Sequence, residues 1–511
     1  MPLVNVDDNE DKMKTDKEKL KAVQLACEAG SLKTLQYLFP LIKKQKLKYF
    51  RKFPRNLHAF AIPFAIKKGD LEIIEYLLST GDYFEFTVNE AVVHGHLKIL
   101  KYLFKTYYKM FPFFKVQNCI RSASKNGQLQ ILKYIEEEII PNQFPLESNY
   151  KLPCADVYMD AIQLACRNGH LEILEYILMR RVNHHSHLKK SIYQSGFVPA
   201  AENGHLHIVK YLLNLGVEAQ SGNNYVVKRA AANGHIQVVK YLHIHAGADI
   251  YDNDNCAVKF ASANGHYEVV KYLCEAGANP FAGCNYAVRY AAFYGHLEVV
   301  EYLHKVRHAD IYSDGNFPLI MASANGYYEV VKYLCEAGAD YRSSDDHAFR
   351  NAVANGHLQI VKYFFEKGVD IHSTALNTAV ENGHTEVVKY LFDTGSFGNN
   401  LKLVINDNSP IIAATKGYFQ MIKYLFDHHQ IDIRTNINYF ATKLTLKMVN
   451  KCNEYITFCE KMKMKIRERA QKKIYFWWIP ICYNLTHSSG CGKRMMLKNL
   501  EKAKELGMEF K

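Results

Sequence analysis

The chain repeats one pattern of apolar and polar residues along most of its length. In "ASANGHYEVVKYLCEAGANP", residues 261–280, the apolar residues after the first glycine have the spacing of one helix face: Val269, Val270, Tyr272 and Leu273. The charged residues of the same stretch take the other side of that helix: Glu268, Lys271 and Glu275. Gly277 is expected to end the helix in the left-handed conformation.

A second helix is predicted before the first glycine. Asn255 is a candidate N-cap, because its short side chain can accept a backbone hydrogen bond. Val258, Ala261 and Ser262 then form a narrow face of small residues, which lets two helices approach closely. Gly265 closes this helix, and we expect the residue after it, a histidine in eight of the repeats, to be the polar entry to the following helix.

The same unit recurs with a nearly constant period. Between Gly204 and Gly356, successive marker glycines are 30 or 31 residues apart. Alignment on this glycine gives thirteen markers, at Gly30, Gly69, Gly95, Gly127, Gly169, Gly204, Gly234, Gly265, Gly295, Gly326, Gly356, Gly383 and Gly417. Such a period predicts a solenoid, in which neighbouring units bury the apolar face that no single unit can bury alone.

The repeated unit resembles the ankyrin repeat over roughly residues 22–430. Two short helices, a glycine turn, "VVKYL", "GAD" and a polar loop carry the resemblance. "NYAVRYAAFYGHLEVVEYL" is similar to the ankyrin proteins of giant DNA viruses of amoebae, the mimivirus-like families. The chain departs from the family where "TPLH" usually opens the first helix, since only Pro318-Leu319 keeps part of it. In successive repeats the Thr position of "TPLH" holds Tyr225, Cys256, Tyr286, Phe317 and His347. The His position of the same motif holds Lys228, Lys259, Arg289, Ile320 and Arg350.

The resemblance implies an all-α ankyrin-repeat solenoid of about thirteen helix-turn-helix units. We expect a charged, flexible leader at residues 1–20 and the repeat array at residues 21–430. Irregular insertions are expected near 136–160 and 180–197, and a non-repeat helical tail at 431–511.

In the ankyrin family the first helix of each unit lines the concave face, beside the loop tips. The position two residues after the buried Val258 is turned about 200° away from it and reads, unit by unit, Arg229, Phe260, Tyr290, Met321, Asn351 and Thr378. The loop-tip position reads Tyr251, Phe281, Tyr312, Arg342 and His372. Protein interfaces are enriched in aromatic, Met and Arg residues. We therefore predict a monomeric, noncatalytic scaffold that binds a partner protein on this face.

A neighbouring column on the first helix is basic. It consists of Arg121, Lys228, Lys259, Arg289 and Arg350. Two interpretations stay open: the column complements an acidic partner, or it is a solvated face whose side chains lie over the helix pair.

Composition points to the inside of a cell. The 511 residues are 48% hydrophobic and 23% charged, which is ordinary for folded protein. The charged start differs from a signal peptide, and the longest apolar run, "IYFWWIPIC", is too short to span a bilayer. Twelve cysteines without a C-x-x-C pair fit a reducing compartment. We expect a soluble intracellular protein. If it is viral, we expect it in the host cytoplasm, with host proteins as its partners.

The net charge of +13 is concentrated at the two ends of the chain. Residues 441–511 hold 16 Lys/Arg and 6 Asp/Glu, which gives a net charge of +10. This tail also contains Trp477 and Trp478. Its basic run consists of Lys461, Lys463, Lys465, Arg467 and Arg469. This tail is either a cap on the last repeat or a docking segment. It supports two alternative functions, namely a substrate adaptor for a ubiquitin ligase and a scaffold associated with nucleic acid.

No motif of catalysis is complete. "SGCGKRMM" at 489–496 lacks the first glycine of a phosphate loop, and neither G-x-S-x-G nor H-E-x-x-H occurs. The repeated histidines are about 10 Å apart, the distance between packed helices, whereas zinc ligands lie within about 2.1 Å of one ion. "NHHSH" at 183–187 is read as an exposed loop. We predict no enzyme activity, no metal and no cofactor.

Overall fold

The protein is described by a computed structural model in which all regular elements of the described residues are helices. The described residues are 16–44, 57–79, 84–107, 113–143, 155–182, 189–370 and 373–394, with single positions between 409 and 425. The chain forms two compact units: unit 1 is Met1–Ala261 with Glu268–Ala278, and unit 2 is Ser262–Tyr267 with Asn279–Lys511. The prediction of an all-α solenoid is confirmed.

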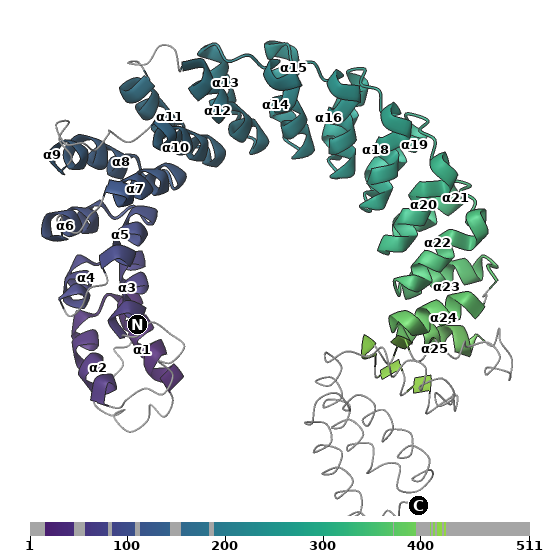
Figure 1. The fold of residues 1–511 in the computed structure, drawn as a ribbon, viewed down its shortest axis with the longest axis horizontal. Coiled ribbons are helices and arrows are strands. Elements are labelled where there is room, and N and C mark those ends of the chain that lie inside the picture. The colour runs from purple at the N-terminus through teal and green to yellow at the C-terminus, as the bar shows by residue number, and fades with distance from the viewer. Residues whose placement is uncertain are drawn as a thin grey trace, which may run out of the picture. The chain divides into compact units, whose positions relative to one another are not determined.

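Each repeat consists of two helices joined by a tight turn, and equivalent helices of successive repeats lie side by side within each unit (Figure 1). The first helices are α1 (Asp16–Ala29), α3 (Leu57–Lys68), α5 (Phe84–Val93), α7 (Phe113–Lys125), α10 (Ala155–Asn168), α12 (Lys189–Glu202), α14 (Ser221–Ala232), α16 (Asp252–Ala263), α18 (Ala282–Phe293), α20 (Ser313–Asn325), α22 (Ser343–Ala354) and α24 (Ser373–Asn382). We call the surface that they turn away from the second helices the first-helix face.

The second helices complete the pairs. They are α2 (Leu32–Lys44), α4 (Leu71–Leu78), α6 (Leu97–Tyr107), α8 (Leu129–Tyr134), α11 (Leu171–Ile177), α13 (Leu206–Asn214), α15 (Ile236–Ala246), α17 (Tyr267–Glu275), α19 (Leu297–Lys305), α21 (Tyr328–Glu336), α23 (Leu358–Glu366) and α25 (Thr385–Asp393). Helix α8 continues into a π-helical turn, η3 (Ile135–Ile139), and α9 (Ile140–Gln143), and α11 continues into η4 (Leu178–Val182). Helix α1 starts at Asp16, five residues before the predicted start of the array.

The helix faces that the sequence predicts to form the core are the faces that the structure buries. Val258, Ala261 and Ser262 on α16 are completely buried, as the narrow face of small residues predicts. On α17, Val269, Val270, Leu273 and Cys274 are buried. Burial of one such Val or Leu side chain stabilises the fold by about 1.5–3 kcal/mol, and every repeat contributes several. Tyr272 was expected in the same stripe but is half-exposed, because its hydroxyl reaches Nδ1 of His243 on α15 at 2.8 Å.

All thirteen marker glycines have a left-handed backbone. Their φ angles lie between 75° and 83°, a region that residues with a Cβ rarely adopt. Each glycine ends a first helix and turns the chain into the next helix, as predicted.

The same glycine also receives a side chain from the following repeat. The ring of His235 lies against Gly204, and a Cβ added to this glycine would be 2.6 Å from Nδ1 of that ring. Nε2 of His235 hydrogen-bonds to the carbonyl of Glu202, at the end of α12, at 2.8 Å. The repeats of unit 1 are therefore joined by a ring that fits where the glycine lacks a side chain.

The histidine stands at the entry to the second helix, as predicted, but its side chain does not cap that helix. The side chains of His170, His205 and His235 make no capping hydrogen bond, because their rings point back to the preceding repeat. Asp70, which stands at the same position in an early repeat, does cap its helix: its carboxylate accepts from the backbone N–H of Ile73 at 3.2 Å.

Other side chains fill the same place when histidine is missing. Gln128 lies against Gly95, and its amide approaches the carbonyl of Val93 at 3.5 Å. Tyr327 lies against Gly295 in unit 2. A planar side chain of the next repeat therefore lies against each of these glycines, and His235 and Gln128 also form a hydrogen bond with a carbonyl of the preceding repeat.

Two glycines of one repeat separate backbone strain from the packing of the ring. Gly204→Ala should lower the free energy of unfolding by about 3 kcal/mol, the sum of left-handed strain and displacement of the His235 ring. Gly216→Ala has the same kind of strain, with φ of 90°, but its Cβ would meet nothing within 4 Å, so its loss should be only about 1–2 kcal/mol. Urea unfolding measures both, and equal losses would show that the ring contributes nothing.

The histidine contacts should make unit 1 sensitive to acid. Burial lowers the pKa of His205 below its ordinary value of 6.5, and the neighbouring imidazoles of His207, His235 and His170 lower it further. A lowered pKa means that the unfolded chain binds this proton more tightly than the folded chain does. The stabilisation is therefore complete above about pH 6.5 and is lost as the pH falls through the folded pKa.

His205→Gln removes the titrating imidazole and leaves a planar side chain in its place, as Gln128 does against Gly95. We expect the thermal midpoint of the natural protein to fall between pH 7 and pH 5, and to fall less in the His205→Gln variant, whose amide can fill the same place as Gln128 does. Calorimetry at the two pH values measures the difference. An equal fall in both proteins would contradict the assignment.

Candidate functional site

The first-helix face carries the residues that the sequence singled out for partner binding. On α18 the buried residues are Ala282, Ala287, Val288, Ala291 and Ala292, and Tyr286 and Tyr290, four residues apart on the other side of the helix, are half-exposed. In unit 1, Phe260 is 41% exposed and has no polar group to satisfy. Arg229 is half-exposed, pairs with Glu202 and lies 6.0 Å from the ring centre of Tyr225.

In unit 2 the predicted column is half-buried rather than fully exposed. Tyr290, Met321 and Asn351 lie on α18, α20 and α22 in turn. Their partial burial leaves enough surface for contact with a partner while their packing holds the side chains in place.

The loop-tip residues connect successive repeats. In unit 1, the hydroxyl of Tyr251 donates to the carbonyl of Ala276 at 2.6 Å. In unit 2, Tyr312 donates to Ala337 at 2.7 Å, and Nη2 of Arg342 donates to Gly368 at 2.6 Å. Phe281 is 41% exposed and cannot make such a bond. Tyr251, Tyr312 and Arg342 thus have a structural role that the sequence did not indicate.

An aromatic cluster on α18 and α20 was missed by sequence reasoning. The rings of Tyr286 and Tyr290 are stacked with centroids 4.0 Å apart. Tyr290 also lies within 6.4 Å of the rings of Phe293, Tyr294 and Phe317. We call these five residues the aromatic cluster. One signal could have revealed it: "AFYGH" at 292–296 stands where the two preceding repeats have "AANGH" and "SANGH" and the following repeat has "SANGY".

Tyr294 replaces a residue with a defined structural role. In six repeats an asparagine before the marker glycine donates its amide N–H to the carbonyl four residues earlier: Asn126, Asn168, Asn203, Asn233, Asn325 and Asn355. A tyrosine cannot make this bond, and Tyr294 instead leaves 47% of its surface exposed. The repeat thus gives up a hydrogen bond, worth about 1 kcal/mol, and exposes an aromatic ring.

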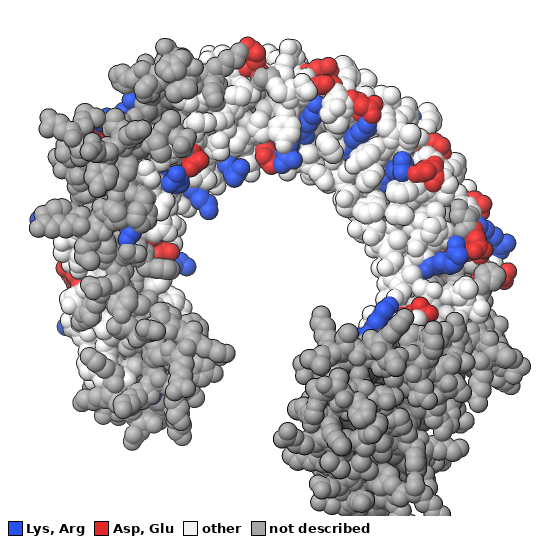
Figure 2. Space-filling model, viewed as in Figure 1, with Lys and Arg blue, Asp and Glu red and all other residues white. Residues whose placement is uncertain are grey.

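The basic column is neutralised within the protein. Each member pairs with an aspartate: Arg121 with Asp160, Lys228 with Asp252, Lys259 with Asp254, Arg289 with Asp314, and Arg350 with Asp345. Figure 2 shows blue and red atoms next to one another on the visible face of each unit. Of the two interpretations of this column, the structure favours the one in which its side chains are held against the protein itself, and Arg121, Lys228 and Arg289 reach an aspartate of the next repeat.

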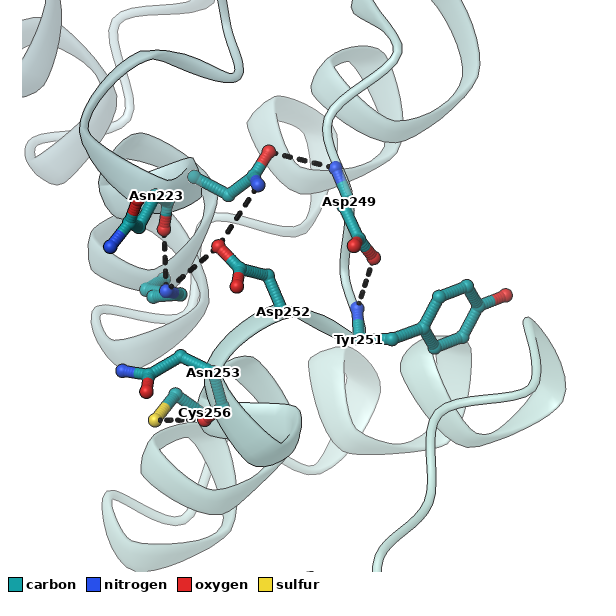
Figure 3. Close-up of polar contacts among 8 residues, drawn as sticks. Asn223, Asp249, Tyr251, Asp252, Asn253 and Cys256 are labelled. Carbon is teal, nitrogen blue, oxygen red and sulfur yellow. Dashed lines mark hydrogen bonds and ion pairs between the residues drawn. The ribbon is translucent and has the colours of Figure 1, made fainter.

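The pairing around Lys228 supports an unusual turn. Gly222, Asn223 and Asn224 all have left-handed backbone, with φ of 64°, 56° and 53°. The Lys228 ammonium donates to the carbonyl of Asn223 at 2.5 Å and lies 3.3 Å from the carboxylate of Asp252 (Figure 3). Gly222 adopts this conformation without steric cost, so the strain falls on Asn223 and Asn224 and amounts to at most about 2–4 kcal/mol, which contacts of this kind offset.

Asn224 joins this turn to the next loop. Its side-chain oxygen accepts from the backbone N–H of Asp249 at 2.8 Å, and its amide donates to the carboxylate of Asp252 at 3.0 Å. The bond from Asn224 lowers the pKa of Asp252, and Lys228 lowers it further. Figure 3 shows this network together with the Asp249 carboxylate, which accepts from the N–H of Tyr251 at 2.8 Å.

Asn255 lies directly before the regular turns of α16, where a cap would stand, but its backbone differs from that of an ordinary N-cap residue. Asn255 has φ of 58° and follows Asn253 and Asp254 in the same conformation, whereas an N-cap residue has an extended backbone. Turns of three left-handed residues recur at Gly283–Asn285 and Asp314–Asn316. These turns stand directly before the residues that replace "TPLH", and in α14, α16 and α18 the turn is contacted by Lys228, Lys259 and Arg289, respectively.

Two other kinds of site are not found in the described part of the chain. No group of three or more His, Cys, Asp or Glu residues there could hold a metal ion. Among the same residues, no helix has both the length and the apolar character that crossing a membrane requires. The tail residues Trp477, Trp478, Lys461, Lys463, Lys465, Arg467 and Arg469 lie outside the described residues.

Comparison with known proteins identifies the repeat. Residues 197–284, 258–345 and 349–437 match a family model of ankyrin repeats in three copies. No curated protein matches the chain. The similarity to viral ankyrin proteins therefore stays a prediction.

The Lys228 network gives a test of the turn. Lys228→Met should destabilise unit 1 by about 1–3 kcal/mol, because the Lys228 side chain is buried and its loss removes the donor to the Asn223 carbonyl and one of the donors to the Asp252 carboxylate. Arg350→Met, at the same position in unit 2, should cost at most about 1 kcal/mol, because its partner Asp345 is 79% exposed. Urea unfolding measures both, and an equal cost would contradict the assigned role of burial.

Proposed function

Ankyrin repeats make up residues 197–345 and 349–437 of this chain, and from this we propose that the protein is a noncatalytic scaffold whose first-helix face in unit 2 binds a partner protein. Ankyrin repeats generally mediate interactions between proteins and are typically without catalytic activity. The identity of the face is our proposal.

The aromatic cluster is the observation that supports this face most strongly. Interfaces draw most of their binding energy from a few aromatic and Arg residues near the centre of the contact. Here five aromatic rings of α18 and α20 contact one another, and Tyr294 is held partly in solvent by Phe293, whose ring lies 4.8 Å away. A rigid aromatic surface loses little conformational entropy when a partner covers it.

Charge pairing within the protein supports the same choice. The guanidinium of Arg289 lies 4.3 Å from the ring centre of Phe317 and binds Asp314 at 2.7 Å. This cation on α18 is therefore paired with residues of the next repeat, on α20, and links the two helices at the edge of the cluster. A partner that covers the cluster meets rings rather than unpaired charges.

The earlier candidates fit this proposal to different degrees. Tyr290 and Met321 lie in or beside the aromatic cluster, and Asn351 continues the column on α22. Arg229, Phe260 and Tyr251 belong to unit 1 and stay predictions of a contact there. The adaptor and nucleic-acid functions of residues 441–511, the monomeric state and the cytoplasmic location also stay predictions.

The repeat itself suggests the variant that tests the proposal. Phe293→Ala with Tyr294→Asn converts "AFYGH" to "AANGH", the wording of the repeat at 231–235. The new asparagine can donate to the carbonyl of Tyr290, as Asn233 does to Arg229, so the fold should be as stable as before or more so. Affinity for the partner should fall at least tenfold, about 1.4 kcal/mol, through the loss of two rings.

The measurement is affinity capture from cell lysate, followed by titration of the captured protein against both forms. A second variant, Ile244→Ala, removes an apolar side chain that is 63% exposed on α15 of unit 1 and should leave binding unchanged. Partners retained equally by the natural protein and by the double variant would overturn the assignment of this face.

A further inference from the structure

The repeat formed by α18 and α19, which carries most of the aromatic cluster, cannot make one of the bonds that join successive loops. In the next repeat, the hydroxyl of Tyr312 before α20 donates to the carbonyl of Ala337 after α21 at 2.7 Å. Phe281 stands at the same place before α18, since its N–H is accepted by the side chain of Asn279 as that of Tyr312 is by Asp310. A phenylalanine side chain has no donor, so this bond is lost between the loops that flank α18 and α19.

The turn after α19 is longer than the turn after α21, and its backbone is less favourable. The N–H of Ala309 donates to the carbonyl of Leu303, six residues earlier, whereas Ala339 after α21 donates to Leu334, five residues earlier. The longer turn contains His308 with φ of 60°, a region in which a residue with a Cβ is disfavoured. The glycines that follow α21 and α23 have positive φ without this cost.

The end of α18 lacks a third contact. Asn325 and Asn355, at the ends of α20 and α22, each donate to a carbonyl of their own helix at 3.0 Å, and Tyr294 replaces this asparagine after α18. Three features of one helix pair therefore lower the stability of its closed form, while the pair of α20 and α21 keeps the corresponding contacts. Regions with fewer stabilising contacts open locally at a lower free energy.

Other contacts hold α18 and α19 against the next repeat. Arg289 on α18 pairs with Asp314 on α20 at 2.7 Å, and Nδ1 of His304 on α19 lies 2.7 Å from the hydroxyl of Tyr333 on α21. Phe317 contributes its ring to the aromatic cluster from α20. The closed form is therefore the resting state, and the aromatic cluster is one continuous surface only in that form.

We propose that α18 and α19 open together, as one local unit, more readily than the pairs α20–α21 and α22–α23, and that a partner bound to the aromatic cluster holds them closed. The opening itself needs no partner. The closing rests on the proposed function, since a partner that covers Tyr290 on α18 and Phe317 on α20 at once binds only the closed form. Partner binding thereby controls the order of one helix pair of the stack.

Hydrogen exchange with mass spectrometry on the purified full-length protein tests the opening without a partner. Amides of α18 and α19 should exchange at one common rate, because an opening pair exposes its amides together. This rate should be at least about tenfold faster than that of α20 to α23. Tenfold corresponds to about 1.4 kcal/mol, which the loss of two hydrogen bonds and the strain of one left-handed residue supply.

A double variant restores two of the contacts with a pair that the protein already uses. In unit 1 the turn after α15 has the same length, and there Nε2 of Gln220 donates at 2.7 Å to the carbonyl of Gly247, which has φ of 64°. Phe281→Gln with His308→Gly copies this pair and leaves the aromatic cluster unchanged. Exchange of α18 and α19 should slow about tenfold, and exchange of α22 and α23 should stay as it was.

Tyr312→Phe is the matched control in the neighbouring repeat. It removes the bond to Ala337 and gives α20 and α21 the loop residue that α18 and α19 have. Exchange of α20 and α21 should therefore become several-fold faster. An unchanged rate would show that the bond between loops does not govern opening, and would overturn its assigned role.

The protein captured from lysate in the test of the proposed function measures the coupling. At 100 times its dissociation constant, a partner that binds only the closed form lowers the open fraction about 100-fold. Exchange of α18 and α19 should therefore slow about 100-fold, while exchange of α3 and α4 in unit 1 should not change.

Equal exchange of α18–α19, α20–α21 and α22–α23 in the purified protein would overturn the opening. Fast exchange of α18 and α19 that the double variant leaves unchanged would overturn it too, and would assign the rate to their place as the first helix pair of unit 2. Exchange that the captured protein leaves unchanged would overturn the coupling. Because the opening is measured without a partner, a failure to capture one contradicts the proposed function and leaves the opening standing.

Discussion

The contact between a marker glycine and a side chain of the next repeat is the constraint on which each unit depends. The glycine must have positive φ to end the first helix, and it must lack a Cβ to leave room for the ring. In unit 2, Gly326 and Gly356 receive the rings of His357 and His384 in the same way. One residue thus serves both the turn within a repeat and the stacking between repeats, and the contact is kept where successive markers are 26 residues apart, at Gly69 and Gly95, and where they are 42 apart, at Gly127 and Gly169.

Stacking in this manner divides the surface of a repeat into two regions. The second helices pack through Val, Ile and Leu, and their Lys and Tyr side chains form contacts between successive repeats, as when Nζ of Lys240 lies 5.3 Å from the ring centre of Tyr272. The first helices need only small residues for packing, so their outer positions are not restricted by the core. Recognition can therefore vary on the first-helix face without loss of the stack.

The loops, unlike the helices, contain backbone conformations that are unfavourable on their own. Their left-handed turns are unfavourable for residues with a side chain, and the protein offsets this with Asn and Asp, which tolerate the conformation, and with a Lys or Arg that binds the turn. Most of the charged side chains on the loop side are therefore paired within the protein. What remains for a partner is apolar and aromatic surface, and the aromatic cluster of α18 and α20 is its largest described example.

Periodicity alone determined the helix pairs, the buried stripe of α17 except Tyr272, the small face of α16 and the left-handed glycines, because each follows from spacing within one repeat. The destinations of the polar side chains were decided by tertiary structure. His235 reaches back to Glu202, and Asn224 reaches forward to Asp249, so their partners are 33 and 25 residues away in the sequence. Whether Lys228 would face a partner or its own loop likewise depended on a turn whose backbone conformation no periodic pattern specifies. The aromatic cluster was visible in the sequence only as a departure from the repeat, since contact between α18 and α20 exists only once the repeats are stacked.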